Sequence, residues 1–206
     1  MKEINIPREQ LMDLLNKLNQ FSEHRIDIFA VGGTALTLLD MKDSTRDVDF
    51  NIDSREGYEE IKKLFKNMDF NPIEENKWMT DIGFRIDLFE QGYIFCTQLL
   101  EDYQKKSKKI KDFGNIRLFA ISPYDIIITK IARMDERDLE DIKTIFKKDK
   151  IDIKKLSERF IKTMDNSFIS NANDNMLLLL KKKLAEWEID TSEEAIKMVE
   201  KWQMRQ

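Results

Sequence analysis

Two hydrophobic periods alternate along the first 121 residues. After Pro7, leucines recur at helical spacing, and residues 54–68 carry a second amphipathic helical pattern. The apolar run Ile26–Val31 predicts a short buried strand. The segment Asp47–Ile52 instead alternates acidic and apolar residues, which predicts a strand with its carboxylates on one face. A short helix is expected at 34–39, a loop at 41–46, and further strands at 77–82, 84–89, 92–95 and 116–121.

The pattern changes after Ser122-Pro123, a pair that suits the N-cap and first turn of a helix. From there on only helical patterns follow, at 123–134, 136–148, 152–165, 172–188 and 191–204. The segment 98–109 is lysine-rich and remains ambiguous. We therefore expect an α+β fold: a small mixed or antiparallel sheet with flanking helices in residues 1–121, and an all-helical C-terminal region, 122–206, packed on it.

Composition narrows the class of protein. The chain has 206 residues, of which 41% are hydrophobic and 36% charged. The net charge of -4 does not indicate a strongly basic nucleic-acid binder, although a local basic patch could still bind RNA. The single cysteine, Cys96, excludes an internal disulfide, and we expect no disulfide-linked partner. The single histidine, His24, leaves little basis for histidine-dependent zinc or triad chemistry. No apolar run approaches about 20 residues, so we expect a cytoplasmic protein without a membrane partner.

Three aspartates carry the strongest chemical signal. Asp47 and Asp49 stand at i and i+2 on one predicted strand, and Asp87 lies in an otherwise apolar strand. Carboxylates on neighbouring strands can converge on Mg²⁺, and a third one allows a second ion about 3.5–4 Å away. Such an arrangement would neutralise a triphosphate, with Asp87 placed to bridge metal and acceptor hydroxyl or to act as general base. The cofactor expected is thus Mg²⁺, with Mn²⁺ as an alternative.

A glycine turn precedes the acids. Gly32-Gly33-Thr34 ends a strand and opens a helix, so backbone N–H groups can approach phosphates and Thr34 adds a hydroxyl. Taken singly, a Gly-Gly pair is usually a turn and an Asp-x-Asp is usually solvated. Their joint order, followed by a carboxylate that would be costly to bury without a partner, indicates a functional site.

The residues "VGGTALTLLDMKDSTRDVDFNI" followed by "FRIDLF" resemble the polymerase-beta-type nucleotidyltransferase superfamily. The resemblance implies the nucleotidyltransferase fold, Asp47, Asp49 and Asp87 as catalytic metal ligands, and a phosphate-contacting turn at Gly33 and Thr34, where many members have Ser. Arg46, beside Asp47, either contacts phosphate or only balances the acidic cluster.

A second segment, "LFAISPYDIIITKIARMDERDLEDI", is similar to the downstream half of abortive-infection-type (AbiEii-like) minimal nucleotidyltransferases. By this resemblance Lys130 would touch the triphosphate, and Asp138 or Asp141 would orient it or hold the basic side chains. From the residues alone, Lys130 lies in an apolar stretch and needs an anionic partner, either a phosphate or a neighbouring Asp. The competing interpretation is a surface salt-bridge ladder, because Asp138 and Asp141 share a helix face.

The leading hypothesis is transfer of a nucleoside monophosphate from NTP to an acceptor hydroxyl on a tRNA or other RNA end, a protein or a small molecule. The resemblance implies a toxin–antitoxin context and an antitoxin partner. A catalytically silent nucleotide-binding or toxin–antitoxin interaction module is the alternative. A glycosyltransferase is disfavoured, because only 46 residues precede Asp47, too few for the nucleotide-binding subdomain of that class.

Overall fold

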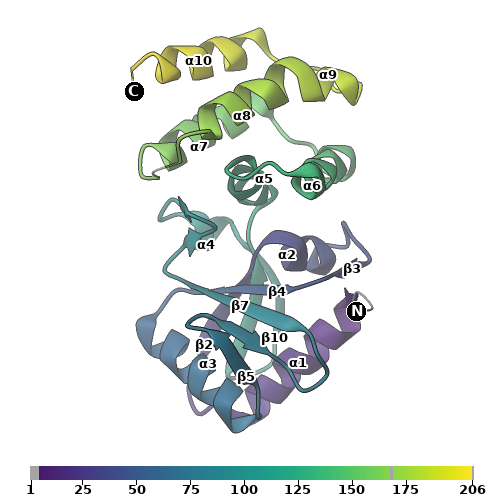
Figure 1. Cartoon of the computed structure of the whole chain (residues 1–206), viewed down its shortest axis with the longest axis vertical. Coiled ribbons are helices and arrows are strands. Elements are labelled where there is room, and N and C mark those ends of the chain that lie inside the picture. Colours follow the sequence, from purple (N-terminus) through teal and green to yellow (C-terminus); the bar gives the residue numbers. More distant parts are fainter. Residues whose placement is uncertain (1–4, 168, 206) are drawn as a thin grey trace. The chain divides into compact units, whose positions relative to one another are not determined.

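The computed structural model describes residues 5–167 and 169–205, and they divide into two compact units (Figure 1). The first unit runs up to Tyr93 and continues with Glu101–Ser122, and the second combines Ile94–Leu100 with the chain from Pro123 onward. The division departs from the expected boundary in one respect, since Ile94–Leu100 belongs with the C-terminal helices. No helix in the described part of the chain has the length and hydrophobicity that a membrane crossing requires.

The main sheet of the first unit has the strand order β10-β11-β2-β4-β7-β6-β5. The pairs β11–β2 and β4–β7 are parallel, and β2–β4, β6–β7, β5–β6 and β10–β11 are antiparallel, so the sheet is mixed as expected. Its strands are β2 (Ile26–Ala30), β4 (Val48–Ile52), β5 (Asn71–Glu74), β6 (Lys77–Met79), β7 (Arg85–Glu90), β10 (Lys108–Asp112) and β11 (Ile116–Ala120). The short strands are β1 (Ile6–Pro7), β3 (Ser44–Thr45), β8 (Tyr93–Ile94) and β9 (Thr97–Gln98).

Helices α1 (Arg8–Phe21) and α3 (Arg55–Asn67) lie side by side against one face of this sheet (Figure 1). Gly57 of α3 lies so close to Ile26 and Ile52 that an added Cβ would lie within 3.2 Å of both side chains. Because strand side chains alternate, the residues between these apolar positions point to the opposite face. That opposite face, called the polar face below, carries Asp27, Phe29, Asp49, Asn51, Lys77, Arg85, Asp87, Phe89, Arg117 and Phe119.

Two short helices complete the first unit. Helix α2 (Gly32–Leu38) follows β2 directly and packs against β3 and β4. Helix α4 (Tyr103–Lys106) brings Tyr103 edge-on to Phe29, with ring centroids 5.3 Å apart. The Tyr103 hydroxyl accepts a hydrogen bond from Asn51 and donates one to Asp53, both at 2.8 Å. These contacts fix α4 to β4 at the end opposite the acidic residues.

The second unit is helical apart from the β9 segment. Its core forms around the buried side chains of Leu156, Phe160, Met176 and Val199, of which the first two are one helical turn apart. A buried ion pair also crosses it, since Arg159 donates to both carboxylate oxygens of Asp125, at 2.6 and 2.9 Å. The helices are α5 (Pro123–Ile131), α6 (Glu136–Lys148), α7 (Ile153–Met164), α8 (Ala172–Leu178), α9 (Leu184–Glu186) and α10 (Glu193–Gln203), with a π-helical segment at Leu179–Lys183.

Most of the expected elements are found, with several corrections. Strand β3 lies inside the segment expected as a loop at 41–46, the strand expected at 77–82 ends at Met79, and the two-residue strand β1 was not anticipated. Strand β5 was not anticipated, because all four of its residues are exposed and it shows no hydrophobic alternation. Strand β10 forms within and beyond the ambiguous lysine-rich segment, whose edge position tolerates lysines. Cys96 is exposed, with a positive φ of 66°.

Candidate functional site

Two of the three predicted metal ligands lie opposite each other in the sheet. Asp49 on β4 and Asp87 on β7 are register partners in a parallel pair. Neighbouring strands lie about 4.8 Å apart, so two side chains in register point the same way at a separation that one ion can bridge. Both carboxyl groups are nevertheless buried, with residue exposures of 8% and 6%.

Asp47 joins this pair through an arginine. It precedes β4 by one residue, and its Oδ2 lies 3.0 Å from Nη2 of Arg85. The Nε of the same guanidinium lies 2.9 Å from Oδ1 of Asp87. One cationic group therefore contacts two of the three predicted ligands, which places Asp47 on the polar face. Sequence reasoning missed Arg85, although its i,i+2 spacing from Asp87 puts both residues on one face of β7.

Thr34 holds the two acids of the Asp-x-Asp motif in place. Its Oγ1 accepts a hydrogen bond from the Asp49 backbone N–H at 2.9 Å and donates one to the Asp47 carbonyl at 3.2 Å. Thr45 donates to the same carbonyl at 2.9 Å. The hydroxyl proton of Thr34, expected to contact phosphate, is thus used within the protein, and the residue is a positioning group in this structure.

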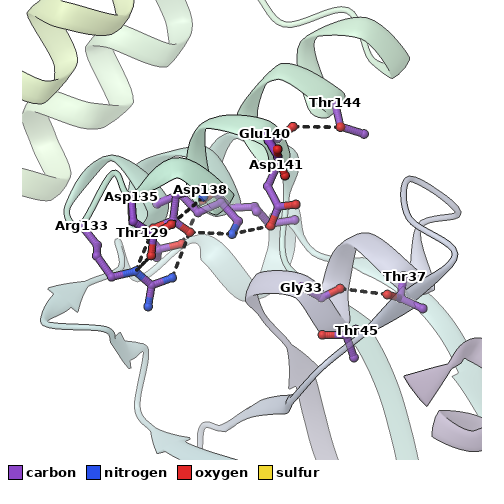
Figure 2. A network of polar contacts seen from close by, with 12 residues as sticks. Gly33, Thr37, Thr45, Thr129, Arg133, Asp135, Asp138, Glu140, Asp141 and Thr144 are labelled. Carbon is purple, nitrogen blue, oxygen red and sulfur yellow. Dashed lines mark hydrogen bonds and ion pairs between the residues drawn. The ribbon is translucent and has the colours of Figure 1, made fainter. Parts of the chain in front are cut away.

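The glycine turn is required by local geometry. Gly32 has a φ of 53°, in the left-handed region where a side chain is strained. A Cβ added to Gly33 would lie 2.7 Å from Oγ1 of Thr45, so Gly33 lets the threonine reach the Asp47 carbonyl. Figure 2 shows Gly33 beside Thr45. The Gly33 carbonyl in turn accepts a hydrogen bond from Thr37 at 3.0 Å. The turn therefore supports the acidic residues directly.

Burial raises the pKa of Asp87 above its ordinary value. Desolvation is the largest cause, the charge of Arg85 opposes it, and the negative charge of Asp47 adds to it. Lys77, the register partner of Asp87 on β6, lowers the pKa only in part, since its amine pairs with Glu74 at 2.6 Å. Asp87 thus has stronger proton affinity than an exposed aspartate, which suits a general base.

The chemistry of the three carboxylate side chains suits a hard divalent cation. Three carboxylates supply the oxygen ligands that Mg²⁺ prefers, and Oδ1 of Asp87 is a buried oxygen that accepts no hydrogen bond of proper geometry in the described part of the chain. Within residues 5–167 and 169–205, however, no group of three or more His, Cys, Asp or Glu side chains is arranged so that it could hold a metal ion, so the convergence of the three acids on an ion stays a prediction. Asp47, Asp49 and Asp87 would supply the ligands, and Arg85 is the cation beside them.

The second predicted cluster lies in the helical unit. Nζ of Lys130 on α5 contacts Asp138 at 2.9 Å and Asp141 at 2.7 Å, both on α6. Arg133 donates to both oxygens of Asp138, at 2.8 and 2.9 Å (Figure 2). Lys130, Asp138 and Asp141 are buried, so the surface salt-bridge ladder is wrong, and neighbouring aspartates are the anionic partners of Lys130.

The electrostatics of Asp138 match this arrangement. Burial alone would raise its pKa, but hydrogen bonds from Arg133 and the charge of Lys130 outweigh that effect, and the net pKa is lowered. The aspartate stays ionised and ties α5 to α6.

Arg46, the other basic residue singled out in the sequence, is exposed beside Asp47. The buried Asp125–Arg159 pair was not anticipated, because the two residues are 34 positions apart.

Comparison with known proteins places this chain in a family. Residues 9–194 match the family described as nucleotidyltransferase of unknown function (DUF6036), and the chain belongs to that family. Among curated proteins, none matches. A crystal structure of a Thermotoga maritima protein proposed to be a nucleotidyltransferase is similar at 14% identity and a TM-score of 0.41, over 71% of this chain and 97% of that one. That similarity is too distant to carry a functional argument.

Proposed function

We propose that this chain is a metal-dependent nucleotidyltransferase that moves a nucleoside monophosphate from NTP to an acceptor hydroxyl. The observation that carries the proposal is the parallel register of Asp49 and Asp87, with Asp47 drawn to the same face by Arg85. Membership of a nucleotidyltransferase family supports it. Mg²⁺ or Mn²⁺, when bound, would supply the positive charge that neutralises the triphosphate.

The residues of the chain have separate tasks in this proposal. The acceptor oxygen forms a bond to the α-phosphorus, the bond from that phosphorus to the bridging oxygen breaks, and pyrophosphate leaves. Asp87 accepts the proton of the acceptor hydroxyl, a role that its raised pKa favours. Thr34 keeps Asp47 and Asp49 aligned. Contact of the turn at Gly32 and Gly33 with the phosphates stays a prediction from the sequence.

The helical unit contributes a buried cluster of ion pairs. Lys130 has two aspartate partners, so the role that the contacts support is fixing α5 to α6, with Asp138 and Asp141 as anchors. Contact of Lys130 or Arg46 with the triphosphate stays a prediction from the sequence. A toxin–antitoxin role, with tRNA or protein as acceptor and an antitoxin as partner, is likewise proposed on the AbiEii-like sequence resemblance alone.

The test is label transfer from each of the four α-³²P-labelled NTPs, with Mg²⁺, total tRNA and cell lysate. Wild-type protein should label one class of acceptor, Asp49→Asn should label none, and Asp112→Asn should behave as wild type. Asp112 is a suitable control because it is an exposed aspartate on the edge strand β10. Metal-dependent nucleotide binding without transfer would contradict the proposed enzymatic activity and favour a catalytically silent nucleotide-binding module.

A further inference from the structure

Arg85 occupies the position of a cation between two predicted metal ligands. Its Nη2 lies 3.0 Å from Asp47 and its Nε lies 2.9 Å from Asp87. A divalent ion bound to these same oxygens, Oδ2 of Asp47 and Oδ1 of Asp87, could not coexist with the guanidinium that now contacts them. The ion pairs of Arg85 and the binding of a metal therefore compete for the same two side chains.

The contact with Asp87 is close but poorly aligned. Arg85 Nε and Asp87 Oδ1 are both buried, yet neither has a hydrogen bond of proper geometry among the described residues. Arg117, on the same polar face, instead holds both carboxylate oxygens of Asp27 through Nε and Nη2. Two aligned hydrogen bonds make such a pair strong and specific. Arg85 is thus held mainly by charge, and less firmly than Arg117.

The head group of Arg85 can also move away from the two acids into solvent. Its side chain is 40% exposed, whereas the Asp87 side chain is 8% exposed. Arg85 is the first residue of β7, so its head group can turn into solvent without breaking the sheet. The carboxyl group of Asp87, by contrast, stays buried in the middle of the parallel pair.

We propose that Arg85 is an exchangeable counter-ion of the metal site, which neutralises Asp47 and Asp87 until a divalent cation displaces it. The inference rests on the proposed function, because it takes these acids as metal ligands. Arg85 lowers the affinity of the acids for a divalent cation in the absence of nucleotide. The reason is that each binding event must first break the two ion pairs of Arg85. It is a positioning residue that acts through the acids.

The affinity for Mn²⁺ alone tests this, measured on the full chain by electron paramagnetic resonance of free Mn²⁺. Arg85→Gln should bind Mn²⁺ about tenfold more tightly than wild type, a change of about 1.4 kcal/mol. Arg85→Lys, which keeps the charge, should stay within about threefold of wild type. Arg117→Gln is the matched control and should leave the affinity unchanged. Equal or weaker Mn²⁺ binding by Arg85→Gln, in a variant whose circular dichroism shows a folded chain, would overturn the proposal.

Asp49→Asn separates this inference from the proposed function. If Asp49→Asn abolishes Mn²⁺ binding while Arg85→Gln leaves it unchanged, the acids hold metal but Arg85 is not its competitor. If Asp49→Asn binds Mn²⁺ as wild type does, the metal site lies elsewhere and both proposals fail.

Discussion

Asp49 and Asp87 are direct register partners on the parallel strands β4 and β7, although 38 residues separate them in the chain. Parallel pairing is the reason that two acids from distant segments share one face at one level of the sheet. The pairing buries both carboxyl groups, and such burial is costly unless a cation compensates it. We therefore expect the two carboxylates that the proposed reaction requires to lower the free energy of unfolding of the metal-free protein.

Replacing Asp87 should lower the activity without lowering the stability of the metal-free fold. Asp87→Asn should reduce nucleotidyl transfer by about 10²–10⁴-fold, because the proposed base and metal ligand is lost. The same change should leave the metal-free fold as stable or raise its free energy of unfolding by about 1 kcal/mol, since a desolvated charge is removed. Urea denaturation in the presence of a chelator measures the second effect. A loss of more than about 2 kcal/mol would show that the carboxylate stabilises the fold.

The raised pKa of Asp87 also gives a sign for pH dependence. The folded state holds this proton to higher pH than the unfolded chain does, so the contribution of Asp87 to stability falls as pH rises from about 4, its unfolded pKa, through the raised value. Unfolding free energies of wild type and Asp87→Asn should therefore diverge with rising pH, in favour of the variant. Parallel curves from pH 4 to pH 7 would contradict the assigned direction.

Thr34 tests whether alignment of the acids matters. Thr34→Ser keeps the hydroxyl that bonds to Asp47 and Asp49 and should retain most activity. Thr34→Val leaves the buried Asp49 N–H without its acceptor and should cost about 1–3 kcal/mol of stability, with activity at least tenfold lower in the folded protein. Thermal unfolding and label transfer measure the two effects. Equal activity in the Ser and Val variants would remove the positioning role.

The sequence predicted that the three acids share one face of the sheet because its signals are local, whereas their role as metal ligands stays a prediction. Alternation along 47–52 fixes the face on which Asp47 and Asp49 point, and Asp87 is conspicuous between apolar neighbours. The role of Arg85 was not predictable in the same way, since it depends on the pairing of β4 with β7. Lys130 could be assigned an anionic partner from its apolar surroundings, but the choice between aspartates and phosphate needed the packing of α5 on α6. Edge strands β5 and β10 escaped notice because exposed strands need no hydrophobic alternation.

A double-mutant cycle on Gly33 and Thr45 should reveal their close approach. Gly33→Ala places a Cβ against the Thr45 hydroxyl and should cost about 1 kcal/mol or more, by pushing that hydroxyl off the Asp47 carbonyl. In a Thr45→Ala background the clash is absent, so the added cost of Gly33→Ala should be smaller by at least 0.5 kcal/mol. Denaturant midpoints of the four proteins give the coupling energy. A coupling near zero would mean that the turn relaxes independently of Thr45.

The buried cluster of the helical unit should be sensitive to the loss of one charge. Asp138→Asn leaves Lys130 with one carboxylate and removes the negative charge and one acceptor oxygen from the pair of hydrogen bonds that Arg133 donates to Asp138, and should cost about 3–5 kcal/mol. The control Lys197→Gln breaks an exposed pair with Glu193 and should change stability by less than about 1 kcal/mol. Because the pKa of Asp138 is lowered, its stabilising contribution is present at neutral pH and lost as pH falls below about 4. A cost similar to that of the exposed control would contradict the buried role.

The most direct measurement of the central claim is anomalous diffraction from crystals of the full chain grown with Mn²⁺ and a non-hydrolysable NTP. We predict an anomalous peak within about 2.5 Å of carboxylate oxygens of Asp49 and Asp87, with the Arg85 head group moved away from Asp87. Nucleotide bound with no manganese at these carboxylates, or manganese held only by other residues, would contradict it.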